Sequence, residues 1–520
     1  MRARACFSCA LATLTVSALL SLLAACNALG QGQARTTEFP YYPPDENTPR
    51  EIIYPYYSLR EGYDSTLHLE NHAAWTVDFT VGVHSLSGQT ALSQPMSIHP
   101  HETVEINVKK LTDDLAVDNR GDFVEGSLSL NFKGKGNPLG GRLVIAGPNG
   151  TVSVDPVSTI SEWGWNKVPT RLDTLWHDLG GARDVELTVS NITGEPVVGD
   201  FYLDFGGRRH TAAPLHFASH ETKNLSIATV LAEMKMTAYD APLGGLSIVP
   251  RGAPALVAQG KITDPEAARV TALPFPLPQL ELASALHATG IAIGVPSADS
   301  PFAGTGNFTP HVYLRNLLDS EQTVTLTMEY PGETAAQRTT LPPLKIAGLS
   351  TKEVTLDSYY AMLPLPLPFC ALRIQYNGPP GSLMAEIDVT NGAGEVADTP
   401  RVDNEGNGYA GSGATQWAFD QEKDFLVFLT NMGEKECPVG FNIWTRGITY
   451  HLTGVKLAAH ETRLINLREL RDRHEPDFRG TVIPANASEG TLSYIRLRNL
   501  PMTGRTLVWP RKKAGDPPPP

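Results

Sequence analysis

Short runs in which apolar and polar residues alternate recur along most of the chain. In residues 98–108, apolar side chains return at every second position after a turn, and residues 457–467 keep much of the same rhythm. Alternation over four to eight residues, bounded by Gly, Pro or Asn, indicates half-buried strands of an antiparallel sheet. Further strands are expected at residues 77–83, 126–132, 197–205, 243–249, 323–330, 382–389, 439–444 and 491–497. Helical turns are expected only at residues 225–236, 356–362 and 464–473, and none of these is long enough to organise a core.

Two short phrases recur at nearly fixed spacing. The first is a strand-like run that ends in Asn, and its copies end at Asn71, Asn191, Asn316 and Asn431, which lie 120, 125 and 115 residues apart. The second is His-Glu-Thr, which begins at His101, His220 and His460, at almost the same distance from the Asn of each copy. The third copy has Leu349-Ser350-Thr351 instead, slightly farther from its Asn. Self-similarity at a fixed period indicates a repeat architecture.

The length of the repeat and the shortage of helix predict the fold class. The expected fold is all-β, a tandem array of about four immunoglobulin-like antiparallel β-sandwich domains. A unit of 115–125 residues is large enough to hold its own core, unlike solenoid repeats, which are stable only when stacked. The disulfide and the strand-C Trp of antibody domains are absent, so the prediction is the general sandwich. The expected sandwiches span residues 51–160, 161–275, 276–402 and 403–510.

The N-terminal segment up to Cys26 has the features of a targeting segment. Arg2 and Arg4 supply positive charge, and residues 10–25 are apolar or small, with only Thr and Ser as polar interruptions. This run is short for a membrane-spanning helix, which needs roughly 20 residues, and it lies where the apolar region of a signal peptide is expected. An ordinary secretion signal and an uncleaved N-terminal helix are the alternatives.

The end of this run, Leu23-Ala24-Ala25-Cys26, resembles a bacterial lipobox. The resemblance implies a signal peptide over residues 1–25 and lipidation of Cys26, whose acyl chains would anchor the protein to a membrane. Asn27 stands where an Asp would imply retention at the inner membrane, so an outer-membrane lipoprotein is expected, with secretion as the alternative. Residues 26–50 are expected to form a flexible tether, and residues 511–520 a Pro-rich disordered tail.

The body of the chain, from about residue 50 to 510, resembles the tandem β-sandwich repeats of large bacterial envelope lipoproteins of uncharacterised function. In those repeats a Pro-Gly-Glu-Thr turn joins two strands, and here His stands at the Gly-like position of the second phrase. The resemblance implies an architecture and a place in the cell envelope. It carries over no catalytic or binding residue.

Composition narrows the classes of function. The chain has 520 residues, and its 46 Gly and 41 Pro argue against long helices or a coiled coil. The formal net charge of -13 argues against a nucleic-acid partner, because neutralising phosphates requires clustered Lys and Arg. Of five Cys, only Cys370 and Cys437 would remain in the folded body, which excludes a disulfide framework and a Cys-rich metal site.

The repeated polar residues favour structural interpretations over chemical ones. The His-Glu pairs lack the second His of a His-Glu-x-x-His zinc site, so a turn is expected and no metal ligand is assigned. Each repeated Asn is expected to end its strand with an Asx-turn. The oxygen-rich loop at residues 403–408 could supply calcium ligands, but its spacing is wrong for an EF-hand, and a solvated linker is favoured.

Neither a nucleophile elbow nor a phosphate-binding Gly loop occurs in the sequence, so no catalytic residue and no cofactor is assigned. Three aromatic residues are candidates for binding carbohydrate: Trp163, Trp165 and Trp417. If they are exposed, their rings can stack on sugars, whereas buried rings would fill the joints between domains.

The first hypothesis is a non-enzymatic, lipid-anchored cell-envelope protein, an extended rod that acts as a structural spacer, scaffold or adhesin. The alternative is a carbohydrate- or cell-wall-binding lipoprotein that uses Trp163, Trp165 and Trp417. A third hypothesis is a glycoside-active enzyme with its site between modules. The expected partners are the membrane, through the N-terminal lipid, and a glycan or a protein, but no nucleic acid.

Overall fold

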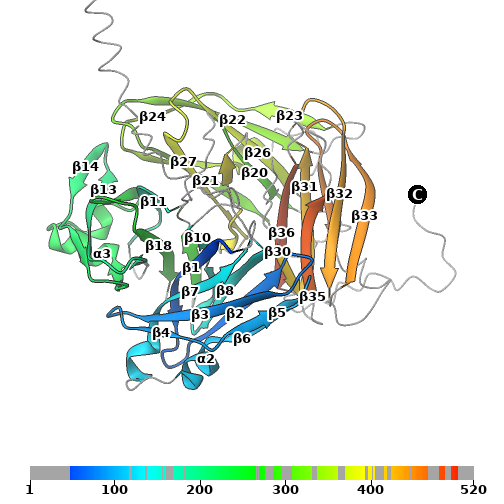
Figure 1. Ribbon diagram of the computed structural model, residues 1–520. Coiled ribbons are helices and arrows are strands. Elements are labelled where there is room, and N and C mark those ends of the chain that lie inside the picture. The colour runs from blue at the N-terminus through cyan, green and yellow to red at the C-terminus, as the bar shows by residue number, and fades with distance from the viewer. Residues whose placement is uncertain are drawn as a thin grey trace, which may run out of the picture.

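Figure 1 shows the computed structural model of the chain, which consists almost entirely of small antiparallel sheets. The structure describes residues 47–115, 120–134, 138–154, 156–159, 168–180, 183–264, 266, 269–273, 275, 285–295, 307–330, 336–360, 369–392, 396–400, 402–404, 415–418, 423–431, 433–445, 448–466, 479–485 and 493–501. The predicted all-β fold of tandem sandwiches is confirmed, because the sheets occur in pairs along the chain.

The first sandwich packs two sheets around one core. One sheet has the order β10 (Val157–Ser158), β1 (Pro49–Ser58), β7 (Glu125–Lys133), β3 (Val77–Ser85) and β4 (Thr90–Leu92), with β5 (Met96–Ile98) also paired to β3. The other has the order β6 (Thr103–Asn107), β2 (Asp64–Asn71), β8 (Leu139–Gly147) and β9 (Gly150–Val154). Its core takes side chains from both sheets, among them Tyr54, Leu67 and Leu128.

The second sandwich repeats this plan. One sheet has the order β11 (Leu172–Trp176), β17 (Gly244–Pro250), β13 (Val197–Phe205) and β14 (Arg208–Thr211), with β15 (Leu215–Phe217) also paired to β13. The other has the order β16 (Thr222–Ser226), β12 (Asp184–Asn191), β18 (Leu256–Asp264) and β19 (Arg269–Leu273). Alternation in the sequence produces this packing directly, since buried and half-buried side chains alternate over the first six residues of β13.

The third sandwich has one sheet of order β23 (Gln337–Thr340), β22 (Gln322–Tyr330), β26 (Phe369–Tyr376), β20 (Ala285–Ala292) and β29 (Val402–Asn404), with β24 (Leu344–Ile346) also paired to β22. The other sheet has the order β25 (Thr351–Thr355), β21 (Thr309–Asn316), β27 (Leu383–Thr390) and β28 (Val396–Asp398). Because β29 pairs with β20, Asp403 and Asn404 belong to the third sandwich, and the expected start of the fourth unit at residue 403 is wrong.

In the fourth unit one sheet has the order β30 (Thr415–Ala418), β35 (Arg479–Ala485), β32 (Cys437–Thr445) and β33 (Ile448–Leu457). The other has the order β34 (Thr462–Asn466), β31 (Lys423–Asn431) and β36 (Ser493–Pro501).

The strand order of these units differs from that of an immunoglobulin constant domain, whose first and second strands share a sheet. Here β1 pairs with β7 and β2 pairs with β8, and the later units follow the same rule.

A short helix follows the strand after the His-Glu-Thr phrase. The helices expected at residues 225–236 and 356–362 are present as α3 (Ile227–Glu233) and α4 (Asp357–Tyr360), and α2 (Val108–Asp114) is their unpredicted counterpart. The last strand residue caps the helix, because the side chains of Asn107 and Ser226 accept hydrogen bonds from backbone N–H groups of α2 and α3. Most of the helix expected at residues 464–473 lies outside the described residues, and residues 464–466 belong to β34.

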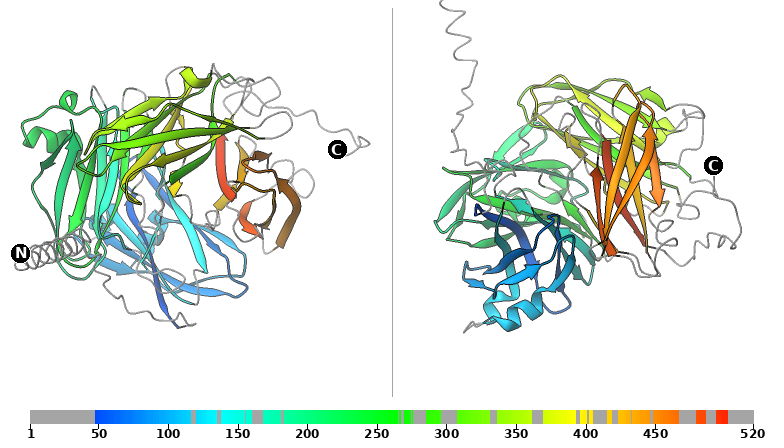
Figure 2. Two further views of the ribbon diagram at one scale, coloured as in Figure 1. Left: turned by 90° about the horizontal axis from the view of Figure 1, so that it is seen from above. Right: turned by 45° about the vertical axis from the view of Figure 1, so that its right-hand side comes forward.

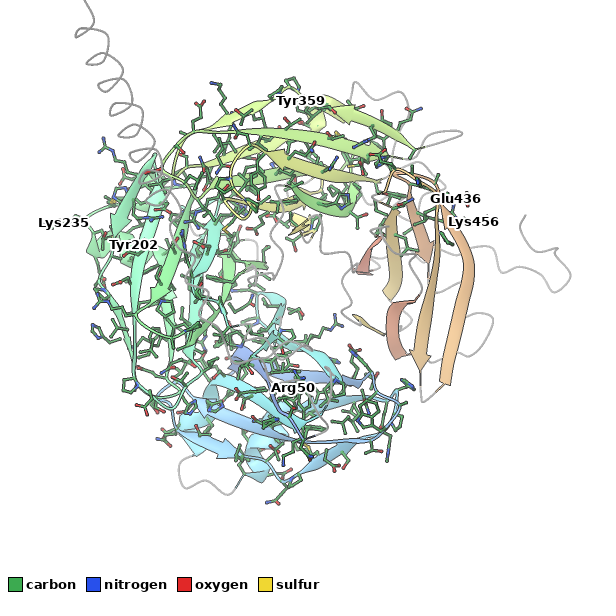
Figure 3. The ribbon with its side chains drawn as sticks, turned by 45° about the horizontal axis from the view of Figure 1, so that its top comes forward. Arg50, Tyr202, Lys235, Tyr359, Glu436 and Lys456 are labelled. Atoms are coloured by element: carbon green, nitrogen blue, oxygen red, sulfur yellow. The ribbon has the colours of Figure 1, made fainter. Side chains whose placement is uncertain are left out.

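The four sandwiches follow one another head to tail around a ring (Figures 2 and 3). At each junction, the sheet that holds the first strand of one unit lies on the sheet that holds the Asn-ending strand of the next. Thus β1 contacts β12 and β18, β11 contacts β27, and β20 contacts β31 and β36. The fourth unit returns to the first, where β35 contacts β6. Head-to-tail contacts close into a ring when the last unit meets the first, so the extended rod expected from the sequence is wrong.

Candidate functional site

Each repeated Asn ties the end of its strand to the corner that carries the second phrase. Asn71 Nδ2 donates hydrogen bonds of 2.7, 3.0 and 3.0 Å to three backbone carbonyls, those of Trp75, Ile98 and His99. Its Oδ1 accepts from the backbone N of Ala73 at 2.8 Å, which completes the predicted Asx-turn. Its backbone N donates to the Glu102 carbonyl at 3.0 Å. We call this arrangement the Asn clasp; it recurs at Asn191, Asn316 and Asn431.

The corner that each clasp Asn holds contains one residue whose backbone has the left-handed conformation, with a positive φ angle. The φ angles are 55°, 55°, 51° and 58° at His101, His220, Leu349 and His460. In three copies the following Glu accepts a hydrogen bond of 2.6–2.8 Å from the backbone N three residues earlier; these are Glu102, Glu221 and Glu461. The turn interpretation of the His-Glu-Thr phrase is therefore confirmed, since each of these carboxylates holds the backbone of its own corner.

In three of the four copies, the residue just before the clasp Asn lies in a joint between units. Ser190 Oγ donates to the Pro55 carbonyl of the first sandwich at 2.8 Å. Thr430 shares a hydrogen bond with Thr289 of the third sandwich. Arg315 reaches into the second sandwich, as described below. Glu70, at the equivalent position of the first sandwich, is buried and lies 2.8 Å from His72 Nε2. One repeated position thus holds a buried polar side chain in all four copies, and in three of them this side chain makes a hydrogen bond across a joint.

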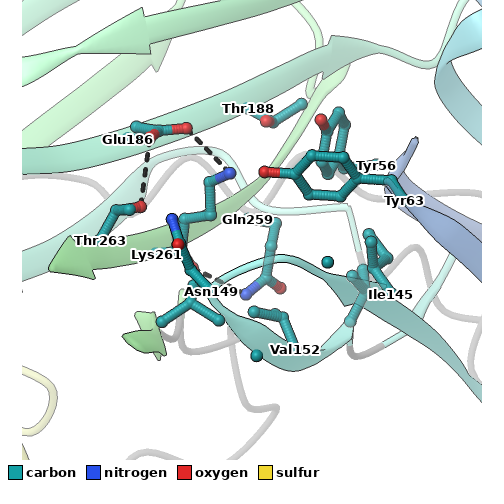
Figure 4. A pocket seen from close by; sticks show the side chains of 15 residues that line it. Tyr56, Tyr63, Ile145, Asn149, Val152, Glu186, Thr188, Gln259, Lys261 and Thr263 are labelled. Carbon is teal, nitrogen blue, oxygen red and sulfur yellow. Dashed lines mark hydrogen bonds and ion pairs between the residues drawn. The ribbon is translucent and has the colours of Figure 1, made fainter. Parts of the chain in front are cut away.

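The joint between the first and second sandwiches contains a small cavity of about 40 Å³ (Figure 4). Three of its polar lining groups pair with one another: Lys261 Nζ lies 2.8 Å from Glu186 Oε2, and Thr263 Oγ1 donates to Glu186 Oε1 at 3.1 Å. Lys261 also lies over the ring of Tyr56, with 5.9 Å between Nζ and the centroid. A cavity of this size holds a few water molecules, so the joint is a packed interface.

Two His rings stack across the same joint. The ring centroids of His84 and His220 are 4.9 Å apart, and His84 bonds to hydroxyls on both sides, Thr90 Oγ1 at 2.9 Å and Ser129 Oγ at 3.0 Å. Burial, together with the neighbouring His220, lowers the pKa of His84 to about 4.

Acidification is expected to destabilise this joint. Between pH 6.5 and about 4 the unfolded chain binds a proton at His84 and the folded chain does not, so stability falls as the pH falls through this window. From pH 7 to 4.5 the loss is about 2 kcal/mol. Hydrogen exchange of the β3 and β16 amides as a function of pH measures it.

In His84→Gln this part of the pH dependence should disappear, because Gln keeps a polar group but takes up no proton. His216→Gln, which alters an exposed residue of β15, is the matched control and should leave the profile unchanged. An unchanged profile in His84→Gln would show that another group carries the acid sensitivity.

The joint between the second and third sandwiches is built around Arg315, whose side chain is completely buried. Its Nη1 donates to the carbonyls of Thr174 and Leu246 at 2.6 and 2.7 Å, and its Nη2 donates to Asp204 Oδ2 at 2.7 Å. Burial opposes ionisation of Asp204, but hydrogen bonds from Arg209 and the charge of Arg315 outweigh it and hold the pKa of Asp204 below its usual value. A buried ion pair between Arg315 of the third sandwich and Asp204 of the second therefore lies at the centre of this joint.

A second polar group lies in the same joint. His177 follows β11 of the second sandwich, and Glu386 and Asp388 alternate along the face of β27 that meets it. All three are buried, and one ligand atom from each lies within 4.8 Å of the others. His177 Nε2 lies 3.2 Å from Asp388 Oδ2 and 4.0 Å from Glu386 Oε1. Among the described residues, these three are the set that could hold a metal ion.

The charges of this group depend on one another. Burial disfavours a charged imidazole, but the carboxylates of Asp178 and Asp388 outweigh burial and raise the pKa of His177 to about 10. Burial raises the pKa of Glu386 to about 8. An open cleft of about 480 Å³ borders the group, and Asp178, Tyr313 and Asp388 contribute to its lining.

The joint between the third and fourth units again uses the His of the second phrase. His460 Nδ1 and Arg338 Nε each lie 3.2 Å from the buried carboxylate of Glu329. Phe428 packs edge-on against Phe369 across the joint, with 5.3 Å between ring centroids. The repeated phrase therefore serves the joint as well as the turn.

Several residues singled out in the sequence lie outside the described part of the chain. These are Cys26, Trp163 and Trp165; Trp417 lies in β30, but its side chain is not described. Trp176 is a core residue that donates to the Ala241 carbonyl at 2.9 Å, and Cys370 is buried.

Within the described residues, no helix combines the length and apolar character needed to cross a membrane.

The residues that build the joints were not identified from the sequence. Arg315 stands at a repeat position occupied elsewhere by Ser, Thr or Glu, and that difference was the available signal. In comparisons with known proteins, no family model matches the chain and no curated protein matches its sequence.

Proposed function

We propose that this protein is a non-enzymatic, lipid-anchored scaffold of the bacterial cell envelope. The observation that carries the proposal is the set of buried polar joints, above all Arg315, which link the four sandwiches in series in a ring that closes where β35 contacts β6. A ring of fixed units presents many loops at constant spacing, which suits a scaffold or adhesin. It suits a spacer less well, because closing the ring shortens the distance that the body can span.

The membrane anchor in this proposal is a lipid on Cys26. Several acyl chains, at about 0.8 kcal/mol per buried methylene, hold a folded body stably at a membrane. Replacing the thiol in Cys26→Ala is therefore expected to abolish incorporation of labelled fatty acid and to move the protein from the membrane fraction to the soluble fraction. Cys370→Ala, which removes a buried thiol of the folded body, is the matched control and should stay membrane-bound. Equal membrane association of both variants would contradict the anchor.

The scaffold role is tested separately in cells by cross-linking to envelope components. An intact ring is expected to give discrete cross-linked species, and Arg315→Ala is expected to lose them while still carrying lipid. If Arg315→Ala keeps every cross-link, the ring is not needed for the contacts. If the native chain instead degrades a cell-wall polysaccharide, the non-enzymatic assignment fails.

A further inference from the structure

The His177, Glu386 and Asp388 group contains polar atoms that the protein itself leaves without a hydrogen bond. They are His177 Nε2, Glu386 Oε1 and both carboxylate oxygens of Asp388. The Asp388 side chain is 2 % exposed and that of His177 is 3 % exposed. Buried polar groups are nearly always satisfied, and an unpaired buried carboxylate is especially costly. His177 and Asp388 lie at ion-pair distance from each other, but Glu386 Oε1 and Asp388 Oδ1 accept no hydrogen bond, and a bound cation would satisfy both oxygens.

We propose that these three residues bind one first-row divalent transition metal ion, with Zn²⁺ as the representative, and that the ion cross-links the second and third sandwiches. One imidazole nitrogen and two carboxylate oxygens are a ligand set that Zn²⁺ and its neighbours accept, whereas Ca²⁺ and Mg²⁺ prefer oxygen alone. With the ion bound, Glu386 and Asp388 are both ionised and His177 is neutral, so the two carboxylates balance the charge of the divalent cation, and the protons that it displaces are released to solvent.

The separations fit a single ion. Ligands bound at about 2.1 Å around a tetrahedral centre lie about 3.4 Å apart. The observed separations from His177 Nε2, 3.2 Å to Asp388 Oδ2 and 4.0 Å to Glu386 Oε1, bracket this value. Small side-chain movements would bring all three atoms into the first coordination shell.

The surroundings of His177 point its Nε2 toward the two carboxylates. Its other ring nitrogen, Nδ1, lies at hydrogen-bonding distance from Asp178 Oδ2, 3.2 Å away, as in the carboxylate–histidine pairs that orient metal-binding imidazoles. Tyr313 stacks on the ring, with centroids 3.9 Å apart and planes 7° from parallel. The bordering cleft, lined in part by Asp388, gives an ion a path to the site.

The site differs from the buried His84 of the joint between the first and second sandwiches. His84 is bonded to two hydroxyls, and no carboxylate lies at its ring nitrogens. It is therefore the natural control, because it is also a buried His in a joint between units.

The test measures Zn²⁺ on the full chain, purified without a histidine tag and dialysed against Zn²⁺, by elemental analysis and calorimetric titration. One bound Zn²⁺ per chain is expected. Asp388→Asn and His177→Ala should each lower the affinity at least tenfold, and Asp178→Asn should lower it about 10–100-fold through the orientation of His177. His84→Gln should bind Zn²⁺ as the native chain does.

Co²⁺ provides a second readout that does not depend on affinity alone. The native chain with Co²⁺ should give visible absorption bands typical of low-symmetry nitrogen–oxygen coordination, and Asp388→Asn should not. Circular dichroism confirms that each variant is folded, and Glu386→Gln is measured beside Asp388→Asn in case one of them fails to fold. Failure to retain any Zn²⁺, or equal retention in the native chain and the Asp388→Asn and Glu386→Gln variants, would overturn the proposal. Neither result would affect the proposed scaffold role, which does not depend on a metal.

Discussion

Arg315→Ala is expected to release the second sandwich from the third. Removing one member of a buried ion pair costs about 3–5 kcal/mol, because the groups left behind stay buried without their partner. Here those groups are the carbonyls of Thr174 and Leu246 and one oxygen of Asp204. Asp204 keeps two hydrogen bonds from Arg209, so the loss should lie near the lower end of this range.

The space around Arg315 is also shaped for it. A Cβ added to Gly245 would overlap the Arg315 side chain, so the glycine in β17 is required by the close approach of the guanidinium. Arg315→Lys should restore little of the lost stability, because one ammonium group cannot make the hydrogen bonds that the planar guanidinium of Arg315 makes. The measurement is hydrogen exchange of the β11 and β17 amides, together with small-angle scattering for the opening of the ring.

Arg251→Ala is the matched control for Arg315. Arg251 pairs with Asp200 of the neighbouring β13 at 2.6 Å, but its side chain is 56 % exposed. Solvent and salt screen an exposed pair, which therefore contributes little to stability, so this variant should exchange nearly as the native chain does. If the two variants behaved alike, Arg315 would not be what holds the joint.

The strands were predictable because their signal is local. The strand expected at residues 197–205 coincides with β13, and the strand expected at residues 323–330 lies within β22. Apolar and polar residues alternate along a strand whenever one of its faces is buried, and this pattern can be recognised within a few neighbouring residues of the sequence. The repeat then gave the number of units, because the same signals return every 115–125 residues.

The clasp was predicted only in its parts. The Asx-turn at Asn71 and the turn at His101 each follow from the conformational preferences of single residues. Their contact with each other is a tertiary interaction. Its trace in the sequence was the nearly constant separation of the two phrases, which is expected when the same two points of the fold touch in every copy.

The joints could not be predicted, because both faces of their strands are buried. In β27, Ile387 and Val389 enter the core of the third sandwich, while Glu386 and Asp388 face the second. Sequence alternation distinguishes an apolar face from a polar one, but a polar face can meet either solvent or another unit. The relative rotation of the units decides this, and it also decides that the array closes into a ring and does not extend.

Asn71→Ala is expected to give the second large effect, a loss of about 4 kcal/mol in the first sandwich. The side chain is completely buried, and its removal leaves the carbonyls of Trp75, Ile98 and His99 without their donor. An unsatisfied buried group costs about 1–3 kcal/mol, and part of this is recovered where water reaches the half-exposed corner. Asn71→Asp keeps the shape and tests the donor alone, because a carboxylate would face three carbonyl oxygens.

Because the chain contains several cores, its unfolding is not a single two-state transition, and the loss must be read locally. Hydrogen exchange of the β2, β5 and β6 amides does this, since the clasp joins β2 to the corner between β5 and β6. Asn107→Ala is the control in the same sandwich: its side chain is exposed and caps α2 by accepting from Lys110 N at 2.9 Å. Loss of a helix cap costs about 1 kcal/mol. A similar loss in both variants would mean that the clasp is worth no more than a cap, and that packing alone maintains the corner.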